Sequence, residues 1–348
     1  MAAFLGQDAI FWTGLGLGLI GGFLLFCFFG VIIVAKFVQQ QDVYDNDHWK
    51  LNVRVPFATM WMNMGYWVNA EGNPIRDFEE ACCALLHEVL SESGVLEKDA
   101  VSSSKLAILD LGIGCGDQSW ELRRLLQARG WGEYRYVGLT LNPTQFQLAA
   151  NRLCEVVQKL AVADRSIQVF RADAARPDSW ETEINNAVLS LKDDHTQDQE
   201  RWVLALDTLY HFFPSRRPIL NYAVETLDAS FMAFDLILND GAPFWQKLVA
   251  KIIGLAMKCP AGAFVTEVEY KSQLKAAGYD EKHIHFRDIT DHVFSGLVSH
   301  IKHQEEVLRP FGISVSKFKV AGKIFGWFAK SGVLRATIVI ARNKPKRS

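Results

Sequence analysis

The chain has 348 residues, of which 49% are hydrophobic and 22% are charged, and its formal net charge is −2. This length and apolar content exclude a disordered or disulfide-stapled chain and leave room for one or two domains with a sizeable core. Binding along a nucleic acid needs a clustered excess of basic residues, so the near-neutral charge argues against nucleic acid as a partner.

A long apolar segment lies near the N-terminus. The 27 residues from Ala9 to Ala35 contain no ionisable side chain other than one cysteine, and Asp8 and Lys36 flank them. A helix of this length is about 40 Å long, enough to cross a hydrocarbon core of about 30 Å. The length of the segment and the lack of Lys and Arg before it argue against a cleaved signal peptide. We therefore predict a tail over residues 1–8 and one uncleaved transmembrane helix over residues 9–37.

The residues in and around this segment also predict an orientation. Lys36 follows the apolar segment and Asp8 precedes it, so the positive-inside rule places the large C-terminal part in the cytosol. In a eukaryotic cell we expect the membrane to be that of the endoplasmic reticulum. Gly14, Gly18 and Gly22 share one helix face, which would let two such helices pack closely as a homodimer, although small residues are also simply common in membrane helices.

Beyond a juxtamembrane and lid segment (residues 38–100), short β-rich runs alternate with longer helical patterns. Strands are expected at residues 106–111, 134–139, 167–170, 202–206, 231–238 and 334–341. Helices are expected at residues 118–128, 143–160, 180–191 and 216–227. This alternation predicts an α/β fold with a doubly wound, parallel, Rossmann-like sheet over residues 101–348. Ligands of such sheets bind beyond the carboxyl ends of the strands.

The strongest motif follows the first expected strand. Residues 110–116 read DLGIGCG and place Gly112, Gly114 and Gly116 at alternate positions before a helix. Glycines let the backbone approach a ligand closely, and the helix N-terminus offers free N–H groups. A dinucleotide-binding loop reads GxGxxG, but Asp117 stands where its third glycine would be. The acid suits a cationic or amino-bearing ligand better than a pyrophosphate.

These residues resemble the first motif of class I S-adenosylmethionine-dependent methyltransferases. Residues 138–145 (GLTLNPTQ) are similar to the second motif, in the form found in tocopherol, phosphoethanolamine and cyclopropane-fatty-acid methyltransferases. Residues 62–67 (MNMGYW) resemble the NLGYW segment of the tocopherol group, and residues 172–174 resemble the third motif. The resemblance covers residues 57–344. It implies the methyltransferase version of the Rossmann-like fold, methyl transfer as the activity, and S-adenosyl-L-methionine as the cofactor.

The resemblance also implies where the cofactor binds. The Asp of the third motif, here Asp173, accepts a hydrogen bond from the adenine amino group. Many relatives bind the ribose diol through an acid at the end of the second strand; Thr140 stands there, so ribose recognition is expected to pass to Thr140 and Gln145. The complete expected set of cofactor-binding residues is Asp110, Gly112, Gly114, Gly116, Thr140, Gln145, Asp173 and Asp207.

Two residues are candidates for catalysis. Residues 207–212 occupy the fourth motif, which often reads ExxEH in relatives; His211 matches the motif, whereas Tyr210 replaces its second Glu. Methyl transfer from a sulfonium mainly requires positioning of the nucleophile and exclusion of water. Removal of a proton from an oxygen or nitrogen nucleophile is expected to fall to His211, because its pKa lies near neutrality. Tyr66, on the lid segment, is expected to pair with His211 or to line the pocket.

The substrate class is indicated by a basic, apolar helix expected at residues 243–257, in a lid or insert near residues 240–265. Such a helix suits a membrane surface or the cover of an apolar pocket, and ordinary packing on the domain is an equal alternative. Together with the membrane anchor, it favours a small hydrophobic or lipid-like acceptor that is methylated on oxygen or nitrogen.

Three alternatives remain open, and no metal is part of the favoured one. The first is carbon methylation of a sterol or an acyl chain. The second is a catalytically silent scaffold with a methyltransferase fold at a membrane. The third is magnesium-dependent methyl transfer through an oxygen-rich site of Asp207, Asn239 and Asp240.

Overall fold

The structure is a computed structural model that describes residues 18–22, 25–26, 29, 57–97, 105–131, 134–160, 166–192 and 199–343. The chain divides into two compact units. The first comprises Met1–Arg54 and Leu308–Ile313, and the second comprises Val55–Val307 and Ser314–Ser348. The functional site described below lies in the second unit.

The predicted membrane segment lies for the most part outside the described residues. Its described residues are helical, and several of them, including Leu19 and Phe26, have exposed apolar side chains. Among the residues that the structure describes, no helix is both long enough and apolar enough to cross a membrane. The span, its orientation and the dimer through its glycines therefore stay predictions.

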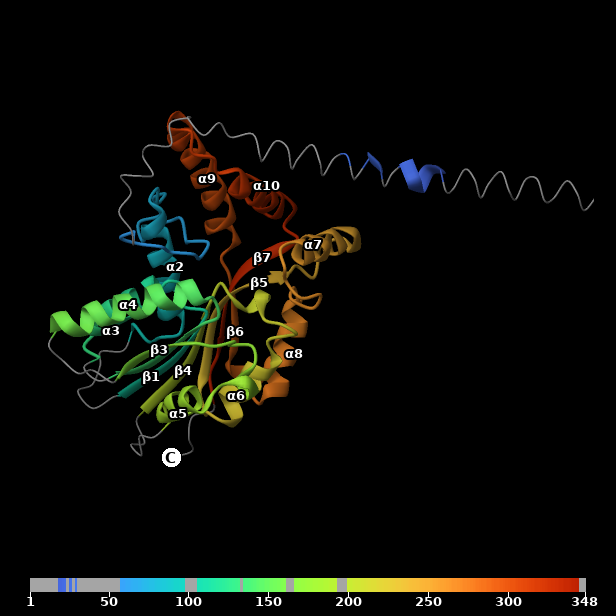
Figure 1. Cartoon of the computed structure of the whole chain (residues 1–348). Coiled ribbons are helices and arrows are strands. Elements are labelled where there is room, and N and C mark those ends of the chain that lie inside the picture. Colours follow the sequence, from blue (N-terminus) through green and yellow to red (C-terminus); the bar gives the residue numbers. More distant parts are fainter. Residues whose placement is uncertain are drawn as a thin grey trace, which may run out of the picture. The chain divides into compact units, whose positions relative to one another are not determined.

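A seven-stranded sheet forms the centre of the second unit (Figure 1). Its strand order is β3-β2-β1-β4-β5-β7-β6. The strands are β1 (Lys105–Leu111), β2 (Tyr134–Thr140), β3 (Ile167–Arg171), β4 (Gln199–Leu206), β5 (Ser230–Leu238), β6 (Ile284–Asp288) and β7 (Leu334–Ala341). Strands β1 to β5 are parallel, which confirms the predicted Rossmann-like arrangement for this part of the sheet.

The prediction of a wholly parallel sheet is wrong at one edge. Strand β7 lies antiparallel between β5 and β6, and β6 itself was not predicted. Strand β6 is short, and only Ile284 at its start is buried, so it lacks the apolar run that indicates a buried strand. The direction of β7 depends on the helical connection that follows β6, and no local pattern in the strand encodes it.

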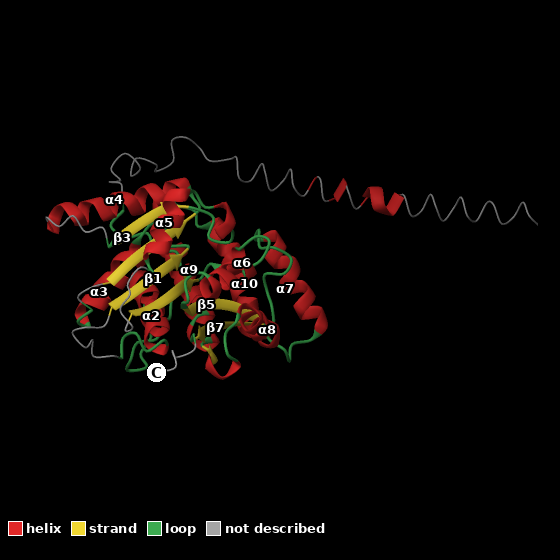
Figure 2. Cartoon of the chain, turned by 90° about the horizontal axis from the view of Figure 1, so that it is seen from below, coloured by secondary structure: helices red, strands yellow, loops and turns green. Residues whose placement is uncertain are grey.

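Helices cover both faces of the sheet (Figure 2). Alternate side chains of β1 point to opposite faces, with Leu106 and Ile108 in one core and Ala107 and Leu109 in the other. The first core also contains residues of α2 (Phe78–Glu92), α3 (Asp117–Ala128), α4 (Pro143–Leu160), α7 (Phe244–Ala256), α9 (Phe294–Leu308) and α10 (Ser316–Ser331). The second contains residues of α5 (Thr182–Ser190), α6 (Arg217–Glu225) and α8 (Glu267–Ala277).

Candidate functional site

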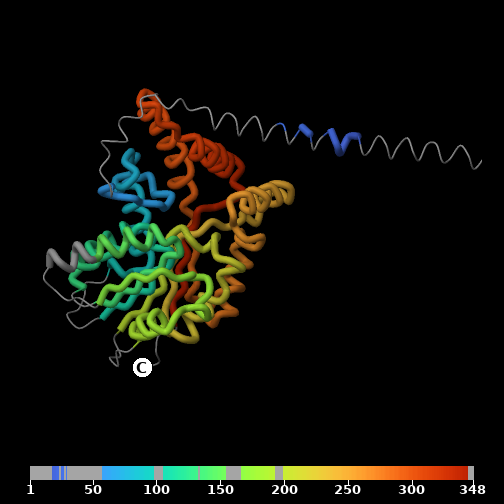
Figure 3. The backbone as a smooth tube through the Cα atoms, viewed as in Figure 1, coloured from blue at the N-terminus to red at the C-terminus, as the bar shows by residue number. Residues whose placement is uncertain are grey.

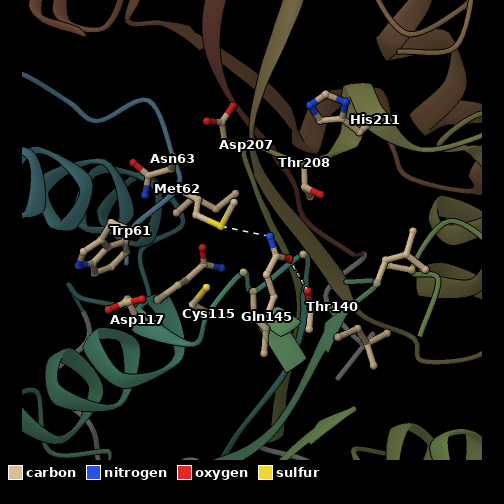
Figure 4. A pocket seen from close by; sticks show the side chains of 18 of the residues that line it. Trp61, Met62, Asn63, Cys115, Asp117, Thr140, Gln145, Asp207, Thr208 and His211 are labelled. Carbon is tan, nitrogen blue, oxygen red and sulfur yellow. Dashed lines mark hydrogen bonds between the residues drawn. The ribbon is translucent and has the colours of Figure 1, made fainter. Parts of the chain in front are cut away.

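A cavity of about 340 Å³ lies at the carboxyl ends of the first four strands. Loops that follow β1, β2, β3 and β4 line it, and residues 60–63 close it from the N-terminal side (Figure 4). Carboxyl ends of parallel strands meet at one edge of a sheet, so residues far apart in sequence converge there. The cavity brings together seven of the ten predicted site residues: Gly112, Gly114, Thr140, Gln145, Asp173, Asp207 and His211.

The glycine loop (residues 112–116) forms one wall of the cavity. Gly112 and Gly114 have φ values of 75° and 57°, a conformation that favours glycine. A Cβ atom on Gly112 would collide with the side chain of Thr208, and one on Gly114 would lie 3.3 Å from the sulfur of Met62. The absence of side chains at these two positions therefore lets the loop lie close to Thr208 and Met62, which also line the cavity.

Gly116 has a different role from the other two glycines. It adopts φ 88° at the N-cap of α3, and its Cβ would lie 3.0 Å from the Cα of Ala149 on α4. Gly116 does not border the cavity described above. It therefore permits close packing of two helices beside the site rather than contact with a ligand.

Asp110 lies behind the glycine loop and does not line the cavity. Its carboxylate is fully buried at the end of β1 and accepts hydrogen bonds from Gln118 Nε2 at 2.6 Å and from the Tyr136 hydroxyl at 2.8 Å. Desolvation by burial raises the pKa of Asp110 to about 7, although both hydrogen bonds act in the opposite direction. These contacts join β1, β2 and α3, so Asp110 positions the loop.

The loops after β2 and β3 supply polar side chains to the cavity. Thr140 Oγ1 lies 3.0 Å from Gln145 Oε1, and Gln145 Nε2 donates to the Met62 sulfur at 3.3 Å (Figure 4). Asp173 is half-buried, and its Oδ1 accepts a hydrogen bond from the Ala175 N–H at 3.0 Å. A carboxylate has two oxygens, so Asp173 keeps further capacity to accept hydrogen bonds at the cavity.

Asp207 follows β4 in a left-handed conformation with φ 60°. Its carboxylate accepts a hydrogen bond from the Tyr210 hydroxyl at 2.6 Å and another from the Met64 N–H at 2.9 Å. Desolvation raises the pKa of Asp207 to about 7, against the effect of both hydrogen bonds. Tyr210 stands at the position of the second Glu in the ExxEH motif. Its hydroxyl is hydrogen-bonded to the Asp207 carboxylate.

His211 lies on the next short turn, Leu209–His211, and lines the cavity. Its Nδ1 lies 3.6 Å from the sulfur of Cys259, and its ring centroid lies 4.5 Å from that of Tyr210. Desolvation lowers the pKa of His211, which favours the neutral imidazole near pH 7. The Nδ1 contact leaves Nε2 as the ring nitrogen available to a ligand.

Tyr66 lies away from the cavity lining. Its side chain is buried, and its ring centroid lies 5.0 Å from that of His292. Burial raises its pKa above the usual value. The expected pairing with His211 is therefore absent from the contacts of these described residues, and Tyr66 packs against His292 on the turn before α9.

The residues that cover the site lie just before Tyr66 in the sequence. The covering segment (residues 57–64) places Trp61, Met62 and Asn63 in the cavity wall (Figure 4). The Met60 N–H donates to Asp117 Oδ1 at 3.1 Å. The resemblance of residues 62–67 to a methyltransferase motif pointed to this segment, but it did not reveal which side chains line the cavity.

Asp117 is neutralised by Arg152, which no sequence motif marks as a site residue. Arg152 forms an ion pair with Asp117 and also donates to the backbone oxygens of Phe57 and Ala58, at 3.3 Å and 3.4 Å. The other Asp117 oxygen, Oδ2, is buried without a hydrogen-bond partner. Asp117 therefore ties α3 to α4 and to the covering segment, in addition to bordering the cavity.

The residues considered for magnesium lie in separate environments. The Asn239 amide binds the Gly332 carbonyl at 2.9 Å, and Asp240 lies 4.0 Å from Arg335. Asp207 faces Tyr210 as described above. Throughout the described part of the chain, no three His, Cys, Asp or Glu side chains are grouped so that they could hold a metal ion.

Comparison with known proteins identifies the fold. No family model and no curated protein matches the sequence. A solved protein from Galdieria sulphuraria, assigned as a sarcosine dimethylglycine methyltransferase, matches with a TM-score of 0.59 and 16% identity over 86% of this chain and 98% of its own. The cyclopropane synthase MmaA2 from Mycobacterium tuberculosis matches with a TM-score of 0.52 and 14% identity, over 81% of this chain and 90% of its own.

A third solved structure is geranyl diphosphate methyltransferase in complex with GPP and sinefungin. It matches with a TM-score of 0.50 and 13% identity, over 82% of this chain and 90% of its own. At these identities the likeness shows the fold alone: the chain has the Rossmann-like fold of these methyltransferases and of the cyclopropane synthase. A shared fold does not define an activity, so the activity is inferred from the residues of the site.

Proposed function

We propose that this chain is an S-adenosylmethionine-dependent methyltransferase that acts on oxygen or nitrogen of a small, hydrophobic or lipid-like acceptor. The predicted helix over residues 9–37 anchors it as a single-pass protein in a membrane, that of the endoplasmic reticulum in a eukaryote, with the second unit in the cytosol. The observation that carries the proposal is the convergence, on one cavity, of Gly112 and Gly114 with polar side chains from the ends of β2 and β3.

The residues around the cavity fit the parts of this cofactor. The glycine loop brings its backbone to the cavity at the N-terminal end of α3, where N–H groups suit the carboxylate of the amino-acid part. Thr140 and Gln145 offer a hydroxyl and an amide for the ribose diol, and Asp173 offers a carboxylate oxygen for the adenine amino group. The solved complex of geranyl diphosphate methyltransferase with sinefungin, in the same fold, supports the choice of cofactor.

When bound, S-adenosylmethionine supplies a methyl group on a sulfonium, which an acceptor nucleophile attacks in line. The chain has two tasks: to exclude water and to remove the proton of an acceptor O–H or N–H. Met62 and Asn63 of the covering segment close the cavity and so exclude water. His211 removes the proton: its lowered pKa keeps the imidazole neutral near pH 7, and Nε2 accepts the proton in the tautomer whose Nδ1–H donates to the Cys259 sulfur.

Carbon methylation is the second candidate, and one observation favours it. Methyl addition to an alkene leaves a carbocation that must lose a proton to a nearby base. The Asp207 carboxylate, which borders the cavity and is bound by the Tyr210 hydroxyl, offers such a base. The cyclopropane synthase among the structural neighbours shows that this fold accommodates chemistry on carbon.

Calorimetric titration of the full chain in detergent with S-adenosylmethionine tests the proposal. We expect saturable binding that Gly114→Arg abolishes, because an arginine there would fill the space beside Met62. The matched control is Gly262→Arg, at an exposed glycine with no atom within 4 Å of its Cβ position. Absence of binding to the native chain would refute the proposal.

The acceptor is found by incubating membranes that contain the protein with methyl-labelled cofactor and extracted lipids. Label in a lipid fraction would support the proposed acceptor class, and chemical degradation of the product would distinguish oxygen, nitrogen and carbon. Cofactor binding without label in any lipid or metabolite fraction would favour the silent scaffold.

A further inference from the structure

Helix α7 exposes an extensive apolar face. Phe244 is 81% exposed and Trp245 is 58% exposed at its first turn. The exposed large apolar side chains of the helix are Phe244, Trp245, Leu248, Val249, Ile252 and Leu255. Only Ala250 and Gly254 of this helix are buried, and a Cβ on Gly254 would lie 2.7 Å from the ring of Phe264. The helix therefore packs through a narrow strip of small residues and leaves most of its apolar surface outside the core.

The charges on α7 have one sign. Lys247 and Lys251 lie in the helix, and Lys258 follows shortly after its end. The helix contains no Asp or Glu. Lys251 and Lys258 are exposed, and Lys247 Nζ donates to the Asp240 carbonyl at 2.8 Å. Helix α10 repeats the pattern, because it too lacks acids and exposes lysines together with Phe318 and Val320. Helix α7 lies at an edge of the second unit (Figure 3).

We propose that α7 lies in the interface of an anionic lipid bilayer, with its exposed apolar side chains among the acyl chains and with Lys251 and Lys258 at the lipid phosphates. Amphipathic helices with aromatic residues on the apolar side and lysines on the polar side bind membranes in this way. Lysine stems extend along an apolar surface while the ammonium group reaches the phosphates. A second copy of the chain is a poorer partner, since a twofold contact through α7 would bring like charges together.

This placement deepens the proposed function, because α7 leads directly to the candidate site. Cys259, three residues after the end of the helix, contacts His211 Nδ1 through its sulfur at 3.6 Å. The ring of Phe264 lies 6.2 Å from that of Tyr210. An α7 helix seated in the bilayer would therefore bring the His211 side of the cavity close to the membrane, where a lipid-like acceptor is dissolved. This contact is separate from the predicted N-terminal anchor.

Quenching of tryptophan fluorescence by brominated lipids tests the placement. The full chain is reconstituted in vesicles of phosphatidylcholine and phosphatidylserine whose acyl chains carry bromine at a shallow or a deep position. Trp245→Phe should remove part of the tryptophan fluorescence that brominated lipids quench. This quenching should be stronger with shallow bromine than with deep bromine, because an interfacial helix lies near the headgroups. The chain has ten tryptophans, so we expect loss of about a tenth of the emission, drawn from the quenched fraction.

Two comparisons make the result specific. Trp120→Phe is the matched control, since Trp120 is 50% exposed on α3, on the other side of the second unit from α7 in Figures 1 and 2, and its loss should leave the quenched component unchanged. Lys251→Glu with Lys258→Glu should remove the Trp245 component in anionic vesicles. If Trp245→Phe leaves bromine quenching unchanged, or if the chain forms a dimer that this substitution dissociates, the proposal is overturned. The readout does not depend on methyl transfer, so failure here leaves the enzyme proposal standing.

Discussion

Gly112 combines two constraints at one position of the candidate site. Its φ of 75° disfavours any side chain, and a Cβ there would collide with Thr208 on the loop after β4. The left-handed conformation alone costs an alanine about 1–2 kcal/mol. We expect Gly112→Ala to lower the free energy of unfolding by at least this amount and to weaken S-adenosylmethionine binding tenfold or more, as measured by urea unfolding and calorimetry.

Gly262→Ala is the control for this prediction. Its Cβ would meet no atom within 4 Å, and it is exposed outside the left-handed region. Both measurements should match those of the native chain. Normal cofactor affinity in Gly112→Ala would show that the loop does not form the binding wall.

His211 should determine the acid side of the pH dependence of methyl transfer. A general base works only when unprotonated, so turnover falls as the pH drops through its pKa. Desolvation lowers the pKa of His211, which places this fall below the usual histidine value of about 6.5. We expect His211→Ala to lower kcat by about 10²–10⁴-fold and to remove the acidic limb, while cofactor affinity is retained.

Labelled-methyl transfer measured from pH 5 to pH 9 checks this prediction. His283→Ala, at an exposed histidine on the turn before β6, is the control and should keep the native profile. An acidic limb that persists in His211→Ala would assign the proton acceptor elsewhere, with Asp207 as the next candidate because its pKa is raised to about 7.

At the level of single residues, the sequence identified motif positions better than side-chain directions. Asp110, near the end of β1, and Asp173, after β3, both belong to recognised motifs, yet only Asp173 borders the cavity. Asp110 is sequestered by Tyr136 from the neighbouring strand and by Gln118 from the following helix. That burial depends on which strand lies beside β1, and a motif read along one chain segment does not contain this information.

The start of the covering segment is bound by Arg152. Arg152 of α4 contacts the Phe57 and Ala58 carbonyls as well as Asp117. We expect Arg152→Ala to free the segment, to increase amide hydrogen exchange at Met60 and Met64, and to raise the KM for S-adenosylmethionine about three- to tenfold. The reason is that a loosened cover adds an ordering cost to binding.

Arg176→Ala serves as the matched control for the covering segment. Arg176 is exposed on the loop after β3, outside the cavity lining, and its removal should leave exchange in residues 57–64 unchanged. Unchanged exchange in Arg152→Ala would mean that Asp117 and Asp207, through their bonds to the Met60 and Met64 N–H groups, suffice to hold the segment.

At the level of elements, apolar runs made β1 to β5 and β7 predictable, because strands buried on both faces consist of such runs. The helix over residues 143–160 was predicted with its observed bounds. Strand β6 lacks this run and was missed. For α7 the sequence predicted the helix, whereas its exposure depends on which surfaces the rest of the fold covers.

At the scale of the whole molecule, a buried ion pair connects the sheet to the helices on one face. Arg216, before α6, binds Asp235 of β5 and the Ala263 carbonyl, and its guanidinium lies 4.5 Å from the centre of the Tyr270 ring on α8. Arg216 is 3% exposed and Asp235 is 0% exposed. Removal of one partner of a buried pair leaves an uncompensated charge, whereas apolar replacement of both partners is often tolerated.

We therefore expect Arg216→Met to lower the free energy of unfolding of the second unit by about 3–5 kcal/mol, and Arg216→Met with Asp235→Leu to recover most of the loss. Urea unfolding followed by tryptophan fluorescence measures both.

Arg216→Met should lose less stability at pH 5 than at pH 8. The reason is that an unpaired buried Asp235 binds a proton more readily in the folded than in the unfolded chain. This stabilising effect disappears as the pH rises through the pKa of Asp235 in the folded chain. Lys275→Met is the control, since the Lys275–Glu281 pair is exposed and its loss should leave the free energy of unfolding nearly unchanged. A double variant no more stable than Arg216→Met would show that the hydrogen bonds of this pair, and not its buried charge, hold α6 and α8 to the sheet.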